Sequence, residues 1–190
     1  LAVINAKDYD YAVVCVGELP STERPGDIYD LDLAKEQQEI VRSLSKTGVK
    51  IILVLVEGRP KIISEIEPLA DAVIQCYLPG DQGAAALADI IFGKINPSGK
   101  LPYTYPRNSG VIMHYDHKQS ELINGNTWKN DFFKPQYRFG FGLSYTDYEY
   151  SNLAIDKDSY SLSDEITITV DVKNIGERAG KEVVQLYTRD

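Results

Sequence analysis

Three short apolar runs divide the first half of the chain, at residues 11–16, 51–56 and 72–77. None of them alternates strictly between apolar and polar positions. Continuous runs of this length are typical of strands that are covered on both faces of a parallel sheet. The pattern therefore predicts three interior strands.

Helices are predicted between and after these strands. Apolar side chains at helical spacing mark the first of them: Leu33, Ile40, Val41 and Leu44. Gly48 is expected to end this helix, and shorter helices are predicted over 61–69 and 81–92. Strands that alternate with helices favour an α/β fold over residues 1–106. We expect a mostly parallel sheet with helices on both faces, an αβα sandwich of flavodoxin-like type.

The second half of the chain has a different pattern. Residues 107–134 are polar and turn-rich, which predicts a long surface loop within a connection at 107–145. Apolar and polar residues then alternate in three segments, at 148–155, 166–172 and 183–187. Such alternation predicts an all-β, immunoglobulin-like sandwich over 146–190. Only about three of its roughly seven strands fit, so we expect this domain to be truncated.

Composition narrows the classes of partner. The 190 residues carry a formal net charge of -8, which argues against a nucleic-acid partner because phosphate binding needs an excess of Lys and Arg. No apolar run approaches the ~18 residues of a membrane span, so we expect no membrane partner. Cys15 and Cys76 lie in apolar runs and are expected to be buried free thiols. A disulfide between neighbouring strands is the alternative.

The candidate chemistry lies in the polar loop 17–27, which follows the first predicted strand directly. The carboxyl end of a parallel strand is where open α/β sheets place their ligands. Two prolines restrict the shapes that the loop can take. Its charged side chains include two glutamates, Glu18 and Glu23, so we expect the loop to carry an acid/base carboxylate.

Three stretches together resemble glycoside hydrolase family 3, the β-glucosidase and β-xylosidase group. They read G-E-x-P-x-x-E-x-x-G-D from Gly17, L-P-G-D-Q-G-A-A-A-L-A-D-I-I-F-G-K-I-N-P-S-G-K-L-P from Leu78 and F-G-F-G-L-S-Y-T from Phe139. The resemblance implies a (β/α)₈ barrel that carries an aspartate nucleophile, then an α/β sandwich that lends an acid/base glutamate, then a fibronectin type III-like module. We expect this chain to be most of the sandwich, without its first strand, plus the start of the module.

The resemblance also implies roles for individual residues. Glu23 is our first choice for the acid/base, because the Asp27 and Leu31 that follow it fit the family's loop better than those after Glu18. Glu18 is the runner-up, since a glutamate so close to the strand is better placed to bind loop amides. Trp128 and Tyr115 are candidate substrate-binding residues, because aromatic faces stack on sugar rings, although they are equally well explained as anchors of the loop.

We expect no cofactor and no metal. His114 and His117 lie in a polar loop without a helix to align their imidazoles and without a nearby cysteine, so a metal site is not favoured. The glycines of Phe139–Gly142 lack the third glycine and the following helix of a dinucleotide site, which speaks against a nucleotide or flavin protein.

The functional expectation is a fragment of a retaining, exo-acting β-glycosidase that hydrolyses terminal β-D-glycosyl residues of a glycoside or oligosaccharide. The fragment supplies the acid/base and lacks the nucleophile, so we expect it to be inactive alone. We expect the chain to start inside a longer, secreted or periplasmic protein, although no signal segment is visible at Leu1. The alternative is a non-catalytic module that binds carbohydrate or protein through the 107–134 loop.

Overall fold

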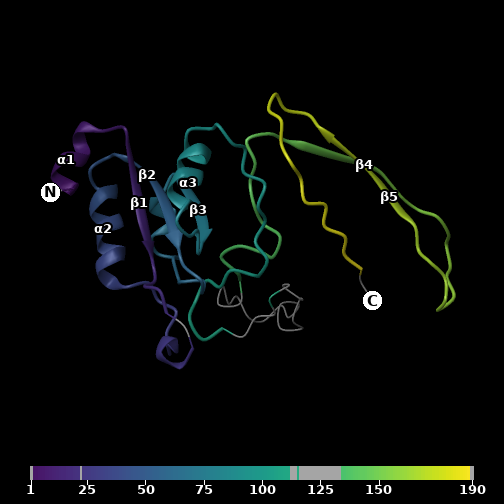
Figure 1. The fold of residues 1–190 in the computed structure, drawn as a ribbon, viewed down its shortest axis with the longest axis horizontal. Helices are drawn as coiled ribbons and strands as arrows, with labels where there is room; N and C mark the ends of the chain where they lie inside the picture. Colours follow the sequence, from purple (N-terminus) through teal and green to yellow (C-terminus); the bar gives the residue numbers. More distant parts are fainter. Residues whose placement is uncertain (1, 22, 112–114, 116–133, 189–190) are drawn as a thin grey trace, which may run out of the picture. The chain divides into compact units, whose positions relative to one another are not determined.

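A computed structural model of the chain describes residues 2–21, 23–111, 115 and 134–188. The chain divides into two compact units (Figure 1). The first comprises Leu1–Leu87 and Leu101–Phe141, and the second comprises Ala88–Lys100 and Gly142–Asp190. Each unit is built on a sheet of its own.

The first unit contains a parallel three-stranded sheet in the order β1-β2-β3 (Figure 1). Its strands are β1 (Tyr11–Gly17), β2 (Lys50–Val56) and β3 (Ala72–Tyr77). All three predicted strands are therefore confirmed. Because successive strands are neighbours and run in the same direction, their carboxyl ends meet at one edge of the sheet.

Helix α2 (Lys35–Ser45) follows β1 and contacts both β1 and β2. It buries Val41 and Leu44 and leaves Ile40 exposed, as expected for an amphipathic surface helix. Gly48 adopts the positive φ, 83°, that favours glycine after a helix. The predicted helix is thus confirmed.

Three further helical segments lie before and after the strands in the chain. The chain enters β1 through α1 (Ala2–Asn5) and the 3₁₀ turn η1 (Ala6–Asp8), and α1 contacts α2. Helix α3 (Gly83–Ile91) follows β3 and is shorter than the predicted 81–92. None of these helices, nor any other among the described residues, combines the length and apolar character that a membrane crossing requires.

The helix predicted over 61–69 is wrong. Ile62 forms an isolated parallel bridge with Asp32, and its amide donates to the carbonyl oxygen of Leu31. Only the 3₁₀ turn η3 (Glu67–Leu69) is helical. Pro68, at the middle of η3, has no amide proton to donate to the carbonyl four residues before it and its ring obstructs the preceding turn, which disfavours an α-helix that continues to residue 69.

The two faces of β1 are not equivalent. Val14 and Val16 lie on the buried face and join the core around Ile51, Leu53 and Leu55 of β2. Tyr11 and Val13 point to the opposite face, where they are 59% and 50% exposed. The expectation that this strand is covered on both faces is therefore wrong. It lies at the edge of the three-stranded sheet and packs against α2 on one face only.

The two cysteines are free thiols. Cys15 lies on the exposed face of β1, and Cys76 in β3 is half-buried. The expectation that both are buried is wrong for Cys15, for the same reason as for its neighbour Val13. β2 lies between the two strands that carry them, so the alternative of a disulfide between neighbouring strands does not arise.

The second unit contains an antiparallel pair of strands, β4 (Tyr148–Ile155) and β5 (Ile168–Asn174), in which Tyr150 lies opposite Val172 (Figure 1). The third predicted strand, 183–187, has no regular secondary structure and pairs with no other described strand, so this prediction is wrong. Alternation specifies which face each side chain takes. A strand also needs a partner for its backbone hydrogen bonds.

Candidate active site

The candidate site begins where β1 and β2 end side by side. Gly17 closes β1 with φ 149°, and a β-carbon there would lie 1.9 Å from the carbonyl oxygen of Val56, so the position requires glycine. The side-chain amide of Gln37 on α2 holds both backbone groups of Gly17. It accepts from the Gly17 amide at 2.8 Å and donates to the Gly17 carbonyl at 3.0 Å. The start of the 17–27 loop is therefore fixed to the helix.

Glu18 is the next residue, and all of its side-chain bonds go to the segment after β2. Its Oε1 accepts from the backbone amides of Gly58 and Arg59 at 3.1 and 2.9 Å. Its Oε2 accepts from Nε and Nη2 of Arg59 at 2.9 and 2.6 Å. Both carboxylate oxygens are therefore engaged by donors, and the side chain is only 14% exposed.

These contacts fix the charge of Glu18. Burial alone raises the pKa of its carboxyl, but the side-chain and backbone hydrogen bonds from Arg59 and the positive charge of that residue outweigh burial and lower the pKa below its usual value. Glu18 is therefore ionised at neutral pH. An ionised carboxylate bound to a guanidinium has no proton to give to a leaving group.

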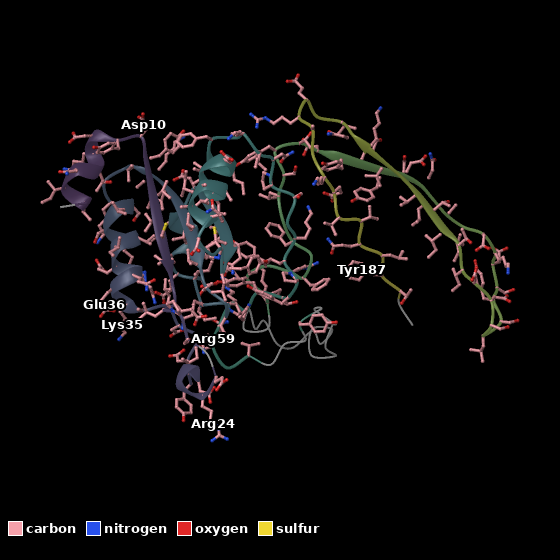
Figure 2. The ribbon with its side chains drawn as sticks, viewed as in Figure 1. Asp10, Arg24, Lys35, Glu36, Arg59 and Tyr187 are labelled. Carbon is pink, nitrogen blue, oxygen red and sulfur yellow. The ribbon has the colours of Figure 1, made fainter. Side chains whose placement is uncertain are left out.

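Arg59 also reaches the far side of the loop. Its Nη1 donates to the carbonyl oxygen of Gly26, and its Nη2 lies 3.2 Å from Oγ of Ser21. Figure 2 shows Arg59 at the base of the loop and Arg24 at its far end. One guanidinium thus binds the first, middle and last parts of the same loop.

Glu23 differs from Glu18 in its exposure, in its carboxylate partners and in its backbone conformation. It is exposed, and none of the described residues bonds its carboxylate. Its backbone has φ 53° and ψ -153°, a region that is populated almost only by glycine, and it precedes the single 3₁₀ turn η2 (Arg24–Gly26). Holding a glutamate there costs about 1–3 kcal/mol. Strained backbone of this kind is common at functional sites, where the surrounding structure holds a residue in an unfavourable conformation that orients its side chain.

Glu57 is a third carboxyl at this edge of the sheet, and the sequence interpretation missed it. It follows β2 directly and is fully buried. The hydroxyl of Tyr105 lies 2.8 Å from its Oε1 and 2.6 Å from the carbonyl oxygen of Lys61. Desolvation by burial raises the pKa of Glu57, and the negative charge of Glu18 adds to the shift.

The Tyr105 hydroxyl faces two acceptors, Oε1 of Glu57 and the carbonyl oxygen of Lys61. One hydroxyl has one proton, so it satisfies only one of its two acceptors at a time. Oε2 of Glu57 is buried and has no hydrogen-bond partner among the described residues. Glu57 and Arg59 had a signal in the sequence: like the first strand, the second is followed at once by a glutamate, in V-E-G-R-P.

Of the two aromatic candidates the structure describes only Tyr115, whose printed contacts are to residues outside the 17–27 loop. Tyr115 is 69% exposed, and its ring packs edge-on against Phe139 with centroids 5.9 Å apart. Its backbone carbonyl accepts from the amide of Thr104. These contacts suit an anchor of the 107–134 segment. Trp128, His114 and His117 lie outside the described residues. Among those that are described, no three His, Cys, Asp or Glu side chains gather as metal ligands.

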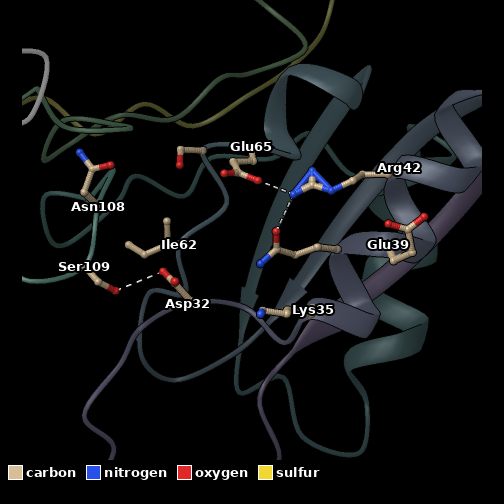
Figure 3. Close-up of a pocket in the computed structure, with 10 residues that line it drawn as sticks. Asp32, Lys35, Glu39, Arg42, Ile62, Glu65, Asn108 and Ser109 are labelled. Atoms are coloured by element: carbon tan, nitrogen blue, oxygen red, sulfur yellow. Dashed lines mark hydrogen bonds and ion pairs between the residues drawn. The ribbon is translucent and has the colours of Figure 1, made fainter.

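A polar pocket of about 590 Å³ lies beside α2, away from Glu18 and Glu23 (Figure 3). Arg42 from α2 and Glu65 from the segment after β2 form an ion pair across it, and Ser109 bonds Asp32 at 3.2 Å. Two of its charged lining residues, Arg42 and Glu65, are thus paired with each other. Neither glutamate of the 17–27 loop lines it.

The fold and the loop together define the class of protein. The first carboxyl-end loop of a parallel sheet presents one clamped glutamate, Glu18, and one exposed glutamate, Glu23. Residues 1–145 match the family model described as the glycosyl hydrolase family 3 C-terminal domain. This chain belongs to glycoside hydrolase family 3.

The matched relatives carry glycosidase names. A lysosomal β-glucosidase from Dictyostelium discoideum is 41% identical over 100% of this chain and 24% of its own length. A β-xylosidase from Formosa agariphila is 36% identical over 100% of the chain and 27% of its own. A periplasmic β-glucosidase from Salmonella typhimurium is 33% identical over 100% of the chain and 26% of its own. The chain therefore spans about a quarter of the length of these relatives.

Solved structures agree with this assignment. A β-glucosidase from Erythrobacter marinus superposes with a TM-score of 0.80 at 36% identity, covering 94% of this chain and 25% of that one. The family resemblance recognised in the sequence is thereby confirmed. So is the α/β character of the chain, with its parallel sheet and smaller antiparallel sheet.

Proposed function

We propose that this chain supplies the general acid/base of a retaining, exo-acting β-glycosidase, and that Glu23 is that residue. The nucleophile is an aspartate on a (β/α)₈ barrel of the same protein, outside these 190 residues. The substrate is a glycoside or oligosaccharide with a terminal β-D-glycosyl residue, in keeping with the β-glucosidase and β-xylosidase names of the relatives. The chain by itself is half of an active site and is inactive.

The observation that carries the proposal is the difference between the two glutamates of the loop: one is bound by hydrogen-bond donors and the other is exposed. Glu18 is held ionised by Arg59 and by two backbone amides. Glu23 is exposed on a strained backbone, with its carboxyl free to meet a group from outside the described residues. A carboxyl that protonates a leaving group has to be accessible and free to change its protonation state. Glu23 meets this condition and Glu18 does not.

The chemistry follows the two-step course of retaining glycosidases. In the first step the barrel aspartate attacks the anomeric carbon while Glu23 gives its proton to the glycosidic oxygen, so that the leaving group departs neutral. In the second step the ionised Glu23 takes a proton from water as the water attacks the covalent glycosyl-enzyme. The two carboxyls of such a pair stand about 5–5.5 Å apart. The barrel therefore covers Glu23 and brings its own aspartate to it.

We also propose how the chain divides into domains: an α/β sandwich, a connection and the start of a β module. Helices cover both faces of a larger parallel sheet in the complete protein, and β4 and β5 open a fibronectin type III-like module over 146–190. The boundaries at 106 and 145 mark the ends of the sandwich domain and of the connection. The protein works outside the cytoplasm, secreted or periplasmic, in keeping with the periplasmic and lysosomal names of two relatives.

The test compares Glu23→Ala with Glu18→Ala in the full-length enzyme. We expect Glu23→Ala to lose about 10²–10⁴-fold in kcat/KM on aryl β-glycosides with poor leaving groups, because they need protonation. Activated substrates are expected to react nearly as fast as before, and added azide should restore turnover by forming the glycosyl azide. The 190-residue chain alone is the control and should show no turnover. Azide rescue of Glu18→Ala, with none for Glu23→Ala, would overturn the assignment.

A further inference from the structure

We propose that Arg59 is the positioning residue of the acid/base loop: it fixes where Glu23 stands without touching it. The inference rests on the proposed function of Glu23 and adds to it a residue from the segment that follows β2. It also gives a role to the arginine that lies three residues after that strand.

Arg59 is itself held on a rigid segment. The amide of Glu57 donates to the carbonyl oxygen of Tyr77 at 3.0 Å, which ties the segment to β3. The hydroxyl of Tyr105, a residue with 1% exposure, bonds the carbonyl of Lys61 on the other side of Arg59. The chain is therefore anchored two positions before and two positions after the arginine, and Pro60 restricts the backbone between these points.

From this support the guanidinium bridges the loop. It binds Glu18 at the start, Ser21 in the middle and the carbonyl of Gly26 at the end. Residues 18 and 26 are the points where a free loop would have to be brought together, and fixing them removes most of its conformational freedom. Glu23 lies between Ser21 and Gly26, inside the segment that the arginine closes.

A short relay connects Arg59 to the backbone of Glu23. The guanidinium donates to the carbonyl oxygen of Gly26. The amide of the same Gly26 donates to the carbonyl oxygen of Glu23 at 2.9 Å. None of the described residues bonds the Glu23 carboxyl. The position of this carboxyl therefore depends on the backbone hydrogen bond from Gly26. Movement of Gly26 would be passed to Glu23 directly.

The pairing with Glu18 has a chemical reason as well. An uncompensated cation close to a catalytic acid favours loss of the acid's proton. Glu18 neutralises Arg59 through two bonds to one oxygen, so the arginine holds the loop as half of a neutral pair. Lysine offers a single point of charge and cannot reproduce a planar fork that reaches three parts of a loop.

The test measures leaving-group dependence in the full-length enzyme carrying Arg59→Ala. We expect kcat/KM to fall about 100-fold for aryl β-glycosides with poor leaving groups, the usual cost of misplacing a catalytic group by about 1 Å. For a dinitrophenyl glycoside, whose departure needs little protonation, the loss should stay within about 5-fold. An equal loss on both substrates would overturn the proposal, because it would mean that Arg59 acts on folding or on sugar binding.

Two further variants keep the result interpretable. Arg59→Lys retains the charge, and we expect it to recover less than about a tenth of the lost kcat/KM, because it cannot bind Gly26 and Glu18 together. Full recovery by lysine would contradict a positioning role, and this variant also serves if Arg59→Ala does not fold. Arg42→Ala is the matched control: it removes an arginine–glutamate pair of the same domain and should leave the leaving-group dependence unchanged.

Failure of this inference is distinguishable from failure of the proposed function. If Glu23→Ala shows leaving-group dependence and azide rescue while Arg59→Ala shows neither selective loss nor any loss, Glu23 is the acid/base and Arg59 does not position it. If Glu23→Ala lacks both signatures, the proposed function fails whatever Arg59 does, and the positioning inference fails with it.

Discussion

Glu18 and Glu57 stand at equivalent places, the first directly after β1 ends at Gly17 and the second directly after β2 ends at Val56. The strands are neighbours in register, and the amide of Glu18 donates to the carbonyl of Val56. Yet Glu18 has a lowered pKa and Glu57 a raised one. The first meets a guanidinium and two amides, and the second meets a buried tyrosine hydroxyl.

The difference shows that position at the carboxyl edge of a parallel sheet does not define what a carboxyl does. The pKa of a carboxyl depends on the groups that the fold packs against it. A carboxylate that is bound to a cation becomes a structural clamp with a lowered pKa, and a carboxyl that is buried under a tyrosine has a raised pKa because its charged form is desolvated. Glu23 receives neither kind of partner from the described residues, and for that reason we propose it as the acid/base.

The largest expected effect comes from Glu18→Ala. It leaves Arg59 without an anion and the amides of Gly58 and Arg59 without an acceptor. We expect the free energy of local opening to fall by about 2–4 kcal/mol, the range for breaking a largely buried charged pair. Hydrogen exchange of the Gly58 and Arg59 amides in the full-length protein measures it.

The control for that experiment is Glu65→Ala. Glu65 forms the other arginine–glutamate pair, with Arg42, but its side chain is 73% exposed. Exposed pairs contribute about 0–1 kcal/mol, so exchange near α2 should hardly change. Equal losses for the two variants would mean that burial does not separate the two pairs.

A smaller effect is expected from Tyr105→Phe. The change keeps the ring in its contacts with Tyr103 and Tyr137 and removes only the hydroxyl that Glu57 and Lys61 share. Leaving buried acceptors without a donor costs about 1–3 kcal/mol. The shift in the thermal unfolding midpoint checks this expectation. An unchanged midpoint would show that the hydroxyl contributes nothing to the support of Arg59.

The most subtle prediction separates the two glutamates by pH. Because the folded pKa of Glu18 is lowered, its contribution to stability is present above its unfolded pKa and is lost as pH falls through the folded value. Because the folded pKa of Glu57 is raised, its contribution is present below the unfolded value and is lost as pH rises towards the folded one.

Isosteric variants report these signs. From about pH 3 to about pH 7, Glu18→Gln should become less stable relative to the wild type, whereas Glu57→Gln should become more stable relative to it. Unfolding midpoints across this pH range give both differences. Parallel changes in the two variants would contradict a lowered pKa for Glu18 and a raised pKa for Glu57.

Much of the fold follows from local pattern alone. Residues 51–56 form β2 because a run of β-branched and leucine side chains suits a pleated, buried surface, and α2 forms because its apolar positions repeat with the helical period. Pattern misled where the partner decides the outcome: Val13 is exposed because its strand is at a sheet edge, and 183–187 lacks a neighbouring strand.

By itself the sequence determined the three parallel strands, the helix between the first two, the family and the loop that carries two candidate glutamates. These features depend on residues that are close together in the sequence. Only the tertiary structure decided which glutamate is clamped, because the cation that binds Glu18 is 41 residues away and the tyrosine that covers Glu57 is 48 residues away. Charge state depends on what lies within a few ångströms in space, and the chain order does not give that distance.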